Sequence, residues 1–154
     1  MTDNHTPEQR RKNMAKIRGE DTGPEKVVRS LLHKLGYRFR LHGRNLPGTP
    51  DLVFPSRQKV IFVHGCFWHM HECRKGKSSP ATNAAFWQTK RQRTAARDDN
   101  ALQALDALGW KAYTVWECTL KDLPTLQFQL EAFLSGKEAK ASLAGKRLRM
   151  AGRR

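Results

Sequence analysis

Histidine and cysteine are concentrated in one short segment of this chain, His64 to Cys73, which reads HGCFWHMHEC. Thiolate and imidazole are the ligands that Zn²⁺ favours, and a closed structural site needs four of them. Cys66, His71 and Cys73 supply three. The candidate for the fourth is Cys118, which follows an apolar segment with the pattern of a strand. The alternative is a group of partly buried side chains that binds no metal. The position of the one distant cysteine directly after a strand favours a zinc site.

Two histidines of the segment, His64 and His69, remain once the zinc ligands are assigned. A histidine with a pKa near neutrality activates a nucleophilic water or polarises a phosphate. Each of the two could instead complete the zinc site or pack in the interior. The sequence leaves these interpretations open.

Asp51 follows a Gly-Thr-Pro turn at the start of a predicted strand, and the next predicted strand ends at His64. One carboxylate at the start of a strand, beside a strand with metal-binding potential, is typical of Mg²⁺-dependent nucleases. The alternative for Asp51 is an ordinary turn residue. The acidic-x-Lys pair usual in such nucleases is missing from Ile61-Phe62-Val63. A second metal ligand from that strand must therefore be a backbone oxygen.

Phe67 and Trp68 are adjacent large aromatic residues inside the polar His/Cys segment. Apolar side chains inserted between base steps unstack a duplex, most easily where its pairing is already damaged. The alternative is that the two rings cap the zinc site or fill the core. Phe86 and Trp87 form a second pair at the start of a predicted helix, and one of them is expected to pack inward.

The charge of the chain favours a polyanionic partner. Its 29 Lys and Arg residues against 14 Asp and Glu residues give a net charge of +15. Nucleic acid is the favoured partner, because each neutralised phosphate releases counterions. Ribosomal RNA, acidic lipid or charge-assisted solubility are the alternatives. The chain shows no apolar run long enough for a membrane span and no secretory signal, and its odd number of cysteines suits a reducing cytosol.

Several elements are needed to position these residues. A helix is predicted after Thr22, because Thr22 and Glu25 have the spacing of a capping box. Strands are predicted at 37–41, 51–54, 59–64 and 111–116, and further helices at about 83–108 and from Pro124 to Gly136. In the helix at 83–108, the basic residues are expected to oppose the leucines; the two groups are Lys90, Arg91, Arg93 and Arg97, and Leu102, Leu105 and Leu108.

This order predicts a single mixed α/β domain, with a mixed central sheet flanked by helices. Residues 1–20 are predicted to be a basic arm that orders on a partner, residues 21–136 the domain, and residues 137–154 a basic, flexible tail.

Together these residues closely resemble the very short patch repair (Vsr) endonucleases. The match spans about residues 10–120, and HGCFWH is its most specific part. The matching residues are Arg11-Lys12-Asn13-Met14, Asp21-Thr22, Glu25-Lys26, Leu46-Pro47-Gly48, Pro50-Asp51, Val60-Ile61-Phe62, His64 through His69, His71, Cys73, Pro80-Ala81-Thr82, Phe86-Trp87, Leu108-Gly109-Trp110 and Val115-Trp116-Glu117-Cys118.

The resemblance implies a PD-(D/E)XK-like nuclease fold and nicking of DNA 5′ to the T of a T·G mismatch left by deamination of 5-methylcytosine. It implies Mg²⁺ held by Asp51 and by the backbone oxygen of Val63. It implies His69 as general base, with His64 assisting at the scissile phosphate. Glu25 is then expected to orient His69 or a metal-bound water, with helix capping as the structural alternative.

The resemblance also implies structural zinc on Cys66, His71, Cys73 and Cys118. Candidate DNA-binding residues are Met14, Phe67, Trp68, Trp87, Lys90 and Arg91, with the aromatic rings entering from one groove and Met14 from the other. The expected setting is a monomer on double-stranded DNA in a bacterial cytoplasm, with mismatch-repair proteins as candidate partners. Three alternatives remain: a less specific, restriction-like nuclease, a non-catalytic zinc-stabilised module for distorted DNA, and a basic RNA-binding protein.

Overall fold

The computed structural model describes residues 6–16 and 20–136. The chain divides into two compact units, Met1–Lys121 and Asp122–Arg154. The predicted tail at 137–154 lies outside the described residues, and the predicted division into arm, domain and tail stays a prediction.

The first unit contains a four-stranded mixed sheet in the order β1-β2-β3-β4. The strands are β1 (Arg40–Leu41), β2 (Leu52–Phe54), β3 (Lys59–His64) and β4 (Lys111–Trp116). The first three strands pair antiparallel, and β3 and β4 pair parallel with His64 opposite Trp116. This sheet confirms the predicted mixed α/β class.

The first strand is shorter than its predicted range of 37–41. The N–H of Tyr37 donates to the carbonyl of Leu32, at the end of the preceding helix, and so takes no part in the sheet ladder. The ring of Phe39 instead packs against the rings of His33 and Phe54. Only Arg40 and Leu41 therefore pair with β2.

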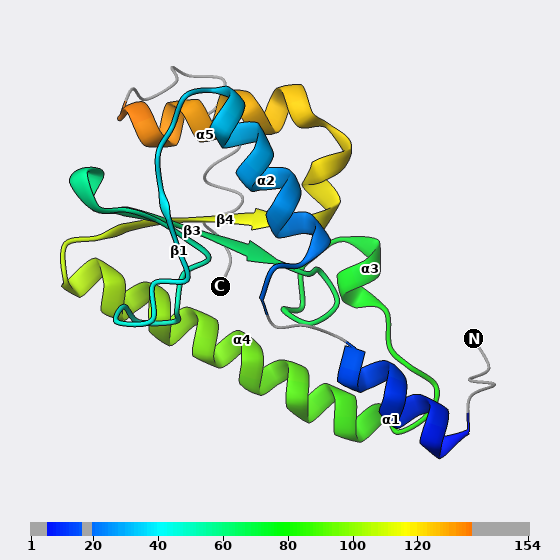
Figure 1. Cartoon of the computed structure of the whole chain (residues 1–154). Helices are drawn as coiled ribbons and strands as arrows, with labels where there is room; N and C mark the ends of the chain where they lie inside the picture. Colours follow the sequence, from blue (N-terminus) through cyan, green and yellow to red (C-terminus); the bar gives the residue numbers. More distant parts are fainter. Residues whose placement is uncertain (1–5, 17–19, 137–154) are drawn as a thin grey trace. The chain divides into compact units, whose positions relative to one another are not determined.

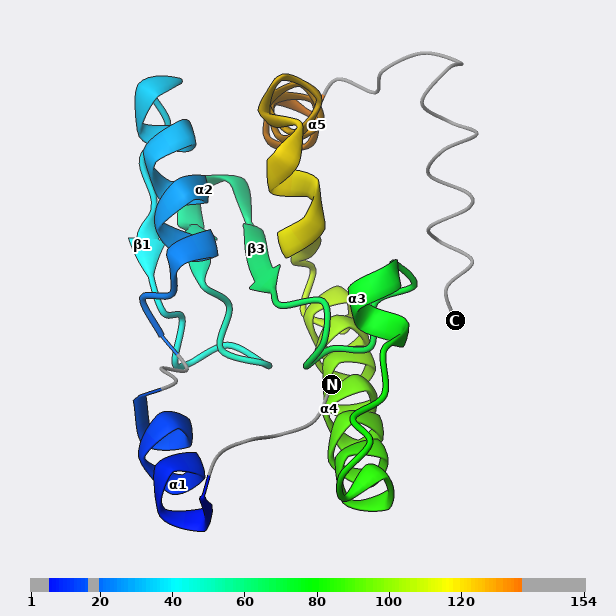
Figure 2. The ribbon, with the colours of Figure 1, turned by 90° about the vertical axis from the view of Figure 1, so that its right-hand side faces the viewer.

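Two long helices pack on the sheet, α2 (Gly23–Lys34) and α4 (Ala84–Ala107), and they lie on opposite sides of β3 (Figures 1 and 2). Val28 and Leu32 of α2 are fully buried. On the α4 side, Leu105 forms a core cluster whose sheet members are Val53, Val60 and Phe62. Alternation along β3 thus sends Val60 and Phe62 toward α4, as expected for a strand buried on both faces.

The helix at Ala84–Ala107 corrects one prediction. Its basic residues do not simply oppose its leucines, because Arg91 is buried together with Leu105, while Leu102 and Leu108 are exposed. Arg91 and Leu105 are fourteen positions apart, close to four helical turns, which places both on the inner face.

The remaining described elements are short or lie in the second unit. The sequence patterns did not mark α1 (Pro7–Lys16), α3 (Arg74–Lys77), or the 3₁₀ turns η1 (Pro55–Arg57) and η2 (Glu117–Lys121). The second unit contributes α5 (Leu123–Ser135), which Asp122 caps by accepting the N–H of Thr125. Among the described helices, none combines the length and apolarity that a membrane span requires.

Candidate active site and metal centre

The four residues predicted as catalytic and the predicted Mg²⁺ ligand Val63 line one cavity of about 850 Å³ in the first unit. Asp51 directly precedes β2, and Val63 and His64 are the last two residues of β3. Glu25 is in the first turn of α2, and His69 is in the loop after β3. The sheet and α2 therefore bring together groups that are up to 44 residues apart in the sequence.

A hydrogen bond from Val63 holds the carboxylate of Asp51 against β3. The backbone N–H of Val63 donates to Oδ2 of Asp51 at 2.7 Å. Burial, together with the nearby Glu25, raises the pKa of Asp51 to about 7 although the Val63 hydrogen bond opposes this shift. Two close carboxylates in a poorly solvated position repel each other when both are ionised, and a divalent cation between them would relieve that repulsion.

Glu25 has both a structural role and a position in the cavity. The Oγ1 of Thr22 accepts the N–H of Glu25 at 3.4 Å, and Oε2 of Glu25 accepts the N–H of Asp21 at 2.9 Å. The first of these bonds confirms that Thr22 caps α2, whereas the second goes to Asp21, the residue before the cap, and not to Thr22 as in a reciprocal capping box. Arg29 donates to the same Oε2 at 3.0 Å and pairs with Asp21 at 2.8 Å. Glu25 is only 2% exposed, and these hydrogen bonds fix the orientation of its carboxylate.

A second group of potential metal ligands, Asp21, Glu25 and His42, lies in this network. Arg29 already occupies it with a guanidinium charge, and hydrogen bonds from Arg29 and His42 lower the pKa of Asp21. The network therefore orients Glu25, and the guanidinium of Arg29 takes the place that a metal ion would have among these ligands.

His64 and His69 stack face to face, with ring centroids 3.7 Å apart and planes 3° from parallel. Burial and the neighbouring His69 lower the pKa of His64 to about 4, so His64 is neutral at physiological pH. Asp98 on α4 lies beside both rings: its Oδ2 is 2.6 Å from Nδ1 of His69 and 4.0 Å from Nδ1 of His64. A carboxylate at Nδ1 leaves Nε2 as the free nitrogen of His69.

Asp98 is the residue of this site that the sequence analysis missed. The available signal was helical periodicity, since Asp98 lies seven residues from both Arg91 and Leu105 and so shares their inward face. Asp98 was not predicted as a site residue because basic residues surround it in the sequence, and an acidic residue in a basic helix usually forms a surface ion pair.

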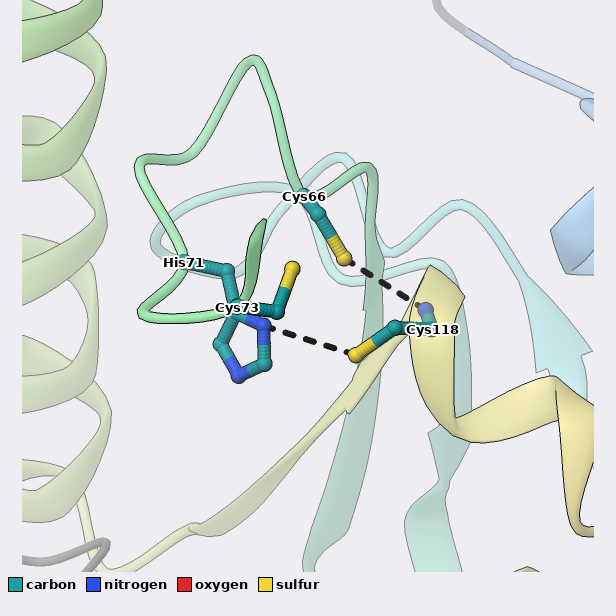
Figure 3. A group of neighbouring side chains, drawn as sticks. All are labelled: Cys66, His71, Cys73 and Cys118. Atoms are coloured by element: carbon teal, nitrogen blue, oxygen red, sulfur yellow. Dashed lines mark hydrogen bonds between the residues drawn. The ribbon is translucent and has the colours of Figure 1, made fainter. Parts of the chain in front are cut away.

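The four predicted zinc ligands converge on one point (Figure 3). The sulfur atoms of Cys66, Cys73 and Cys118 and a ring nitrogen of His71 all lie within 4.8 Å of one another. Tetrahedral zinc with bonds of about 2.3 Å to sulfur places its ligand atoms roughly 3.8 Å apart. Three ligands come from the loop after β3, and Cys118 comes from η2, directly after β4.

Burial opposes ionisation of all three thiols. Burial raises the pKa of Cys66 to about 12. Burial also opposes ionisation of Cys73, but hydrogen bonds, chiefly from the backbone of Gly76 and the side chain of His71, lower its pKa to about 6. Neighbouring thiolates repel one another, and a bound Zn²⁺ would hold all of them ionised. The ring of His71 also stacks on Trp116 at 4.3 Å, which fixes its orientation. These four residues could hold a zinc ion.

Three half-buried aromatic rings form a cluster beside the cavity, and we call Phe67, Trp68 and Trp87 the aromatic cluster. Their ring centroids lie 5.2 to 6.2 Å apart. The exposed Lys90 places Nζ 5.6 Å from the rings of both tryptophans. One of the Phe86–Trp87 pair was expected to pack inward; Trp87 is half-buried, and Phe86 is exposed. Met14 falls within α1, but its side chain lies outside what the structure describes, so its role stays a prediction.

Comparison with known proteins identifies the family. The family model for the DNA mismatch endonuclease Vsr matches residues 2–75. A type II nicking enzyme of Xanthomonas oryzae pv. oryzae, V.XorIIP, is 52% identical over 134 residues, which cover 87% of this chain and 98% of that protein. The DNA mismatch endonuclease Vsr of Escherichia coli is 40% identical over 93% of this chain and 94% of its own length. A type II nicking enzyme of Neisseria meningitidis, V.NmeAIP, is 39% identical over 79% of this chain and 86% of its own length.

This mixed α/β fold, whose cavity gathers carboxylates and histidines, is that of a DNA nicking endonuclease, as its relatives show. The chain belongs to the Vsr DNA mismatch endonuclease family. Its substrate is DNA, which sets aside the RNA-binding and non-catalytic alternatives.

Proposed function

We propose that this enzyme recognises T·G mismatches arising from deaminated 5-methylcytosine and nicks the strand 5′ to the mismatched T, which initiates very short patch repair. The observation that carries the proposal is the adjacency of a catalytic cavity and the aromatic cluster. Trp68 belongs to both, because it lines the cavity with Asp51 and His69 and packs 5.6 Å from Trp87. A ring inserted at a mismatch would thus bring a neighbouring phosphate to the catalytic groups.

The proposed chemistry is metal-assisted phosphodiester hydrolysis on a PD-(D/E)XK-like fold. Mg²⁺, when bound, supplies charge stabilisation at the phosphate. Asp51 and the backbone oxygen of Val63 would hold it, with Glu25 as the adjacent carboxylate. His69, with Nδ1 occupied by Asp98, presents Nε2 to accept the proton of the attacking water. The neutral His64 would contact the scissile phosphate from the stacked position.

A second candidate function is that of a less specific, restriction-like nicking endonuclease. It is favoured by the 52% identity to a type II nicking enzyme, which exceeds the 40% identity to the mismatch endonuclease Vsr of Escherichia coli. A nicking assay separates the two functions. We would measure single-turnover rates on duplexes with T·G, each other mismatch and full pairing, in several flanking sequences, with and without Mg²⁺. Equal rates on the T·G and matched duplexes would rule out the proposed function.

Replacing Trp68 with Ala is expected to lower the preference for a T·G over a matched duplex by roughly 10- to 100-fold. Stacking of one base on an aromatic side chain contributes about 1 to 3 kcal/mol, which the variant loses. The measurement is the ratio of single-turnover rates on the two duplexes. Phe128→Ala is the control, because it removes an aromatic ring of α5 that does not line the cavity. A Trp68→Ala enzyme with the native ratio would remove the aromatic cluster from mismatch selection.

Replacing Asp98 with Asn is expected to reduce nicking by about 10²- to 10⁴-fold with little change in DNA binding. The amide no longer stabilises a protonated His69, and it can select the wrong ring tautomer. Because Asp98 acts through His69, the pH dependence of the single-turnover rate should also shift. Asp99→Asn is the control, since Asp99 is the exposed neighbour on α4. An unchanged rate and pH profile in Asp98→Asn would exclude this positioning role.

A further inference from the structure

We propose that Arg91 is a positioning residue that holds Phe67 and the loop around it against α4, so that mismatch selection depends on Arg91 without contact between Arg91 and DNA. This inference rests on the proposed function, because it assigns the origin of the rigidity of the aromatic cluster. It differs from the direct DNA contact expected for Arg91 from the sequence.

The guanidinium of Arg91 donates to three backbone carbonyls of the segment from Phe67 to Ser78, which includes α3. Its Nε donates to Phe67 at 2.7 Å, its Nη1 donates to Ser78 at 2.9 Å, and its Nη2 donates to Gly76. These acceptors bracket the loop that carries the zinc ligands His71 and Cys73. Arginine suits such a task because its donors lie in one rigid plane, so that little freedom is lost for each hydrogen bond formed.

Arg91 also fixes the ring of Phe67. Its Cζ lies 4.4 Å from the centroid of that ring, a cation–π contact that gains strength when it is desolvated. The backbone and the side chain of Phe67 are therefore held by the same group. The next residue toward the N-terminus, Lys90, lies over Trp68 and Trp87. Two consecutive residues of α4 thus contact all three rings of the aromatic cluster.

The burial of Arg91 decides between positioning and phosphate binding. Arg91 is 3% exposed, and its guanidinium makes hydrogen bonds to the three carbonyls and a cation–π contact with the Phe67 ring. A phosphate could reach the guanidinium only if the loop opened and gave up these hydrogen bonds. The exposed Lys90 is available to the DNA backbone instead. A loop ordered in advance avoids the entropic cost of immobilising its side chains on binding.

The test compares Arg91→Met with Arg93→Met in the zinc-loaded enzyme. Methionine keeps much of the length of arginine but has neither charge nor donors, and Arg93 is an exposed neighbour on the same helix. Binding and nicking of T·G and matched duplexes are measured at several salt concentrations. We expect Arg91→Met to lose about 10-fold of the T·G preference with an unchanged dependence of affinity on salt, and Arg93→Met to keep the preference.

A direct phosphate contact would give a different result in Arg91→Met. Both duplexes would be bound more weakly by the same factor, and the slope of log affinity against log salt would fall by about 0.9. That outcome overturns the proposal. Loss of bound zinc together with the preference also overturns it, since Arg91 would then act only by holding the metal loop.

Two further measurements keep the proposal testable under other outcomes. If Arg91→Met does not fold, Arg91→Lys replaces it; we expect full zinc content and a preference reduced about 2- to 5-fold, and the native preference would overturn the proposal. Acrylamide quenching of tryptophan fluorescence without DNA should increase in the Arg91 variants. If the native enzyme shows no T·G preference, the proposed function fails, while unchanged quenching in the variants would overturn the positioning role by itself.

Discussion

Replacing Asp51 with Asn is expected to abolish nicking and to stabilise the protein at neutral pH. The variant loses the charged oxygen that would hold Mg²⁺, and a loss of several kcal/mol of transition-state stabilisation reduces the rate about 10³-fold or more. DNA binding should persist. The amide oxygen of Asn can still accept the N–H of Val63, so the local geometry is kept.

The gain in stability follows from the pKa of Asp51, which burial raises to about 7 in the folded protein from an ordinary value of 3.8. Between these values the folded state binds a proton that the unfolded state has released, so native stability falls as the pH rises through this window. Asn is neutral throughout. Its advantage should therefore grow from near zero at pH 4 to about 2 to 4 kcal/mol above pH 7.

Thermal unfolding at pH 5 and pH 8, without added Mg²⁺, measures this difference, and single-turnover nicking measures the catalytic loss. Asp99→Asn on the exposed face of α4 should change neither quantity. An Asp51→Asn enzyme that nicks at the native rate would disprove the assigned mechanism. A variant no more stable than the native protein at pH 8 would disprove the electrostatic argument.

Replacing Cys118 with Ala is expected to remove the bound zinc and to destabilise the protein by at least about 3 kcal/mol. In a chain of this length that loss lowers the melting temperature by roughly 6 to 12 °C. As a zinc ligand, Cys118 would join η2 to the loop after β3, so the variant would lose this link between the loop and the segment that follows β4 (Figure 3). Nicking should fall as well, because His69 and Phe67 lie in that loop.

Zinc content by elemental analysis and thermal unfolding test this prediction. Cys118→His is the matched control, because imidazole is also a zinc ligand and should retain part of the metal and of the stability. A native chain that contains no zinc, or a Cys118→Ala protein as stable as the native one, would contradict the zinc assignment.

The sequence by itself determined most of the elements of this fold. Lys59–His64 and Lys111–Trp116 were predicted with the bounds that the structure has. The apolar run of Lys59–His64 is buried from Val60 onward, which gives it a strong local signal, whereas Lys111–Trp116 was expected to be buried and has only Val115 buried. The start of α2 followed from the capping residue Thr22. The short strand at Arg40–Leu41 was overestimated, because its extent depends on partners elsewhere in the chain.

The four residues that could hold zinc were chosen from the sequence, since few residue types bind zinc and Cys118 was the only distant cysteine. What the tertiary structure decided is which groups complete these motifs. Asp98 reaches Nδ1 of His69, Arg29 orients Glu25, and Arg91 turns inward to the loop around Phe67. Each of these three is a charged residue on a helix, and the sequence does not indicate with which of several residues it pairs. The face that the helix presents to the sheet selects one of them, and that face is set by the packing of residues far apart in the chain.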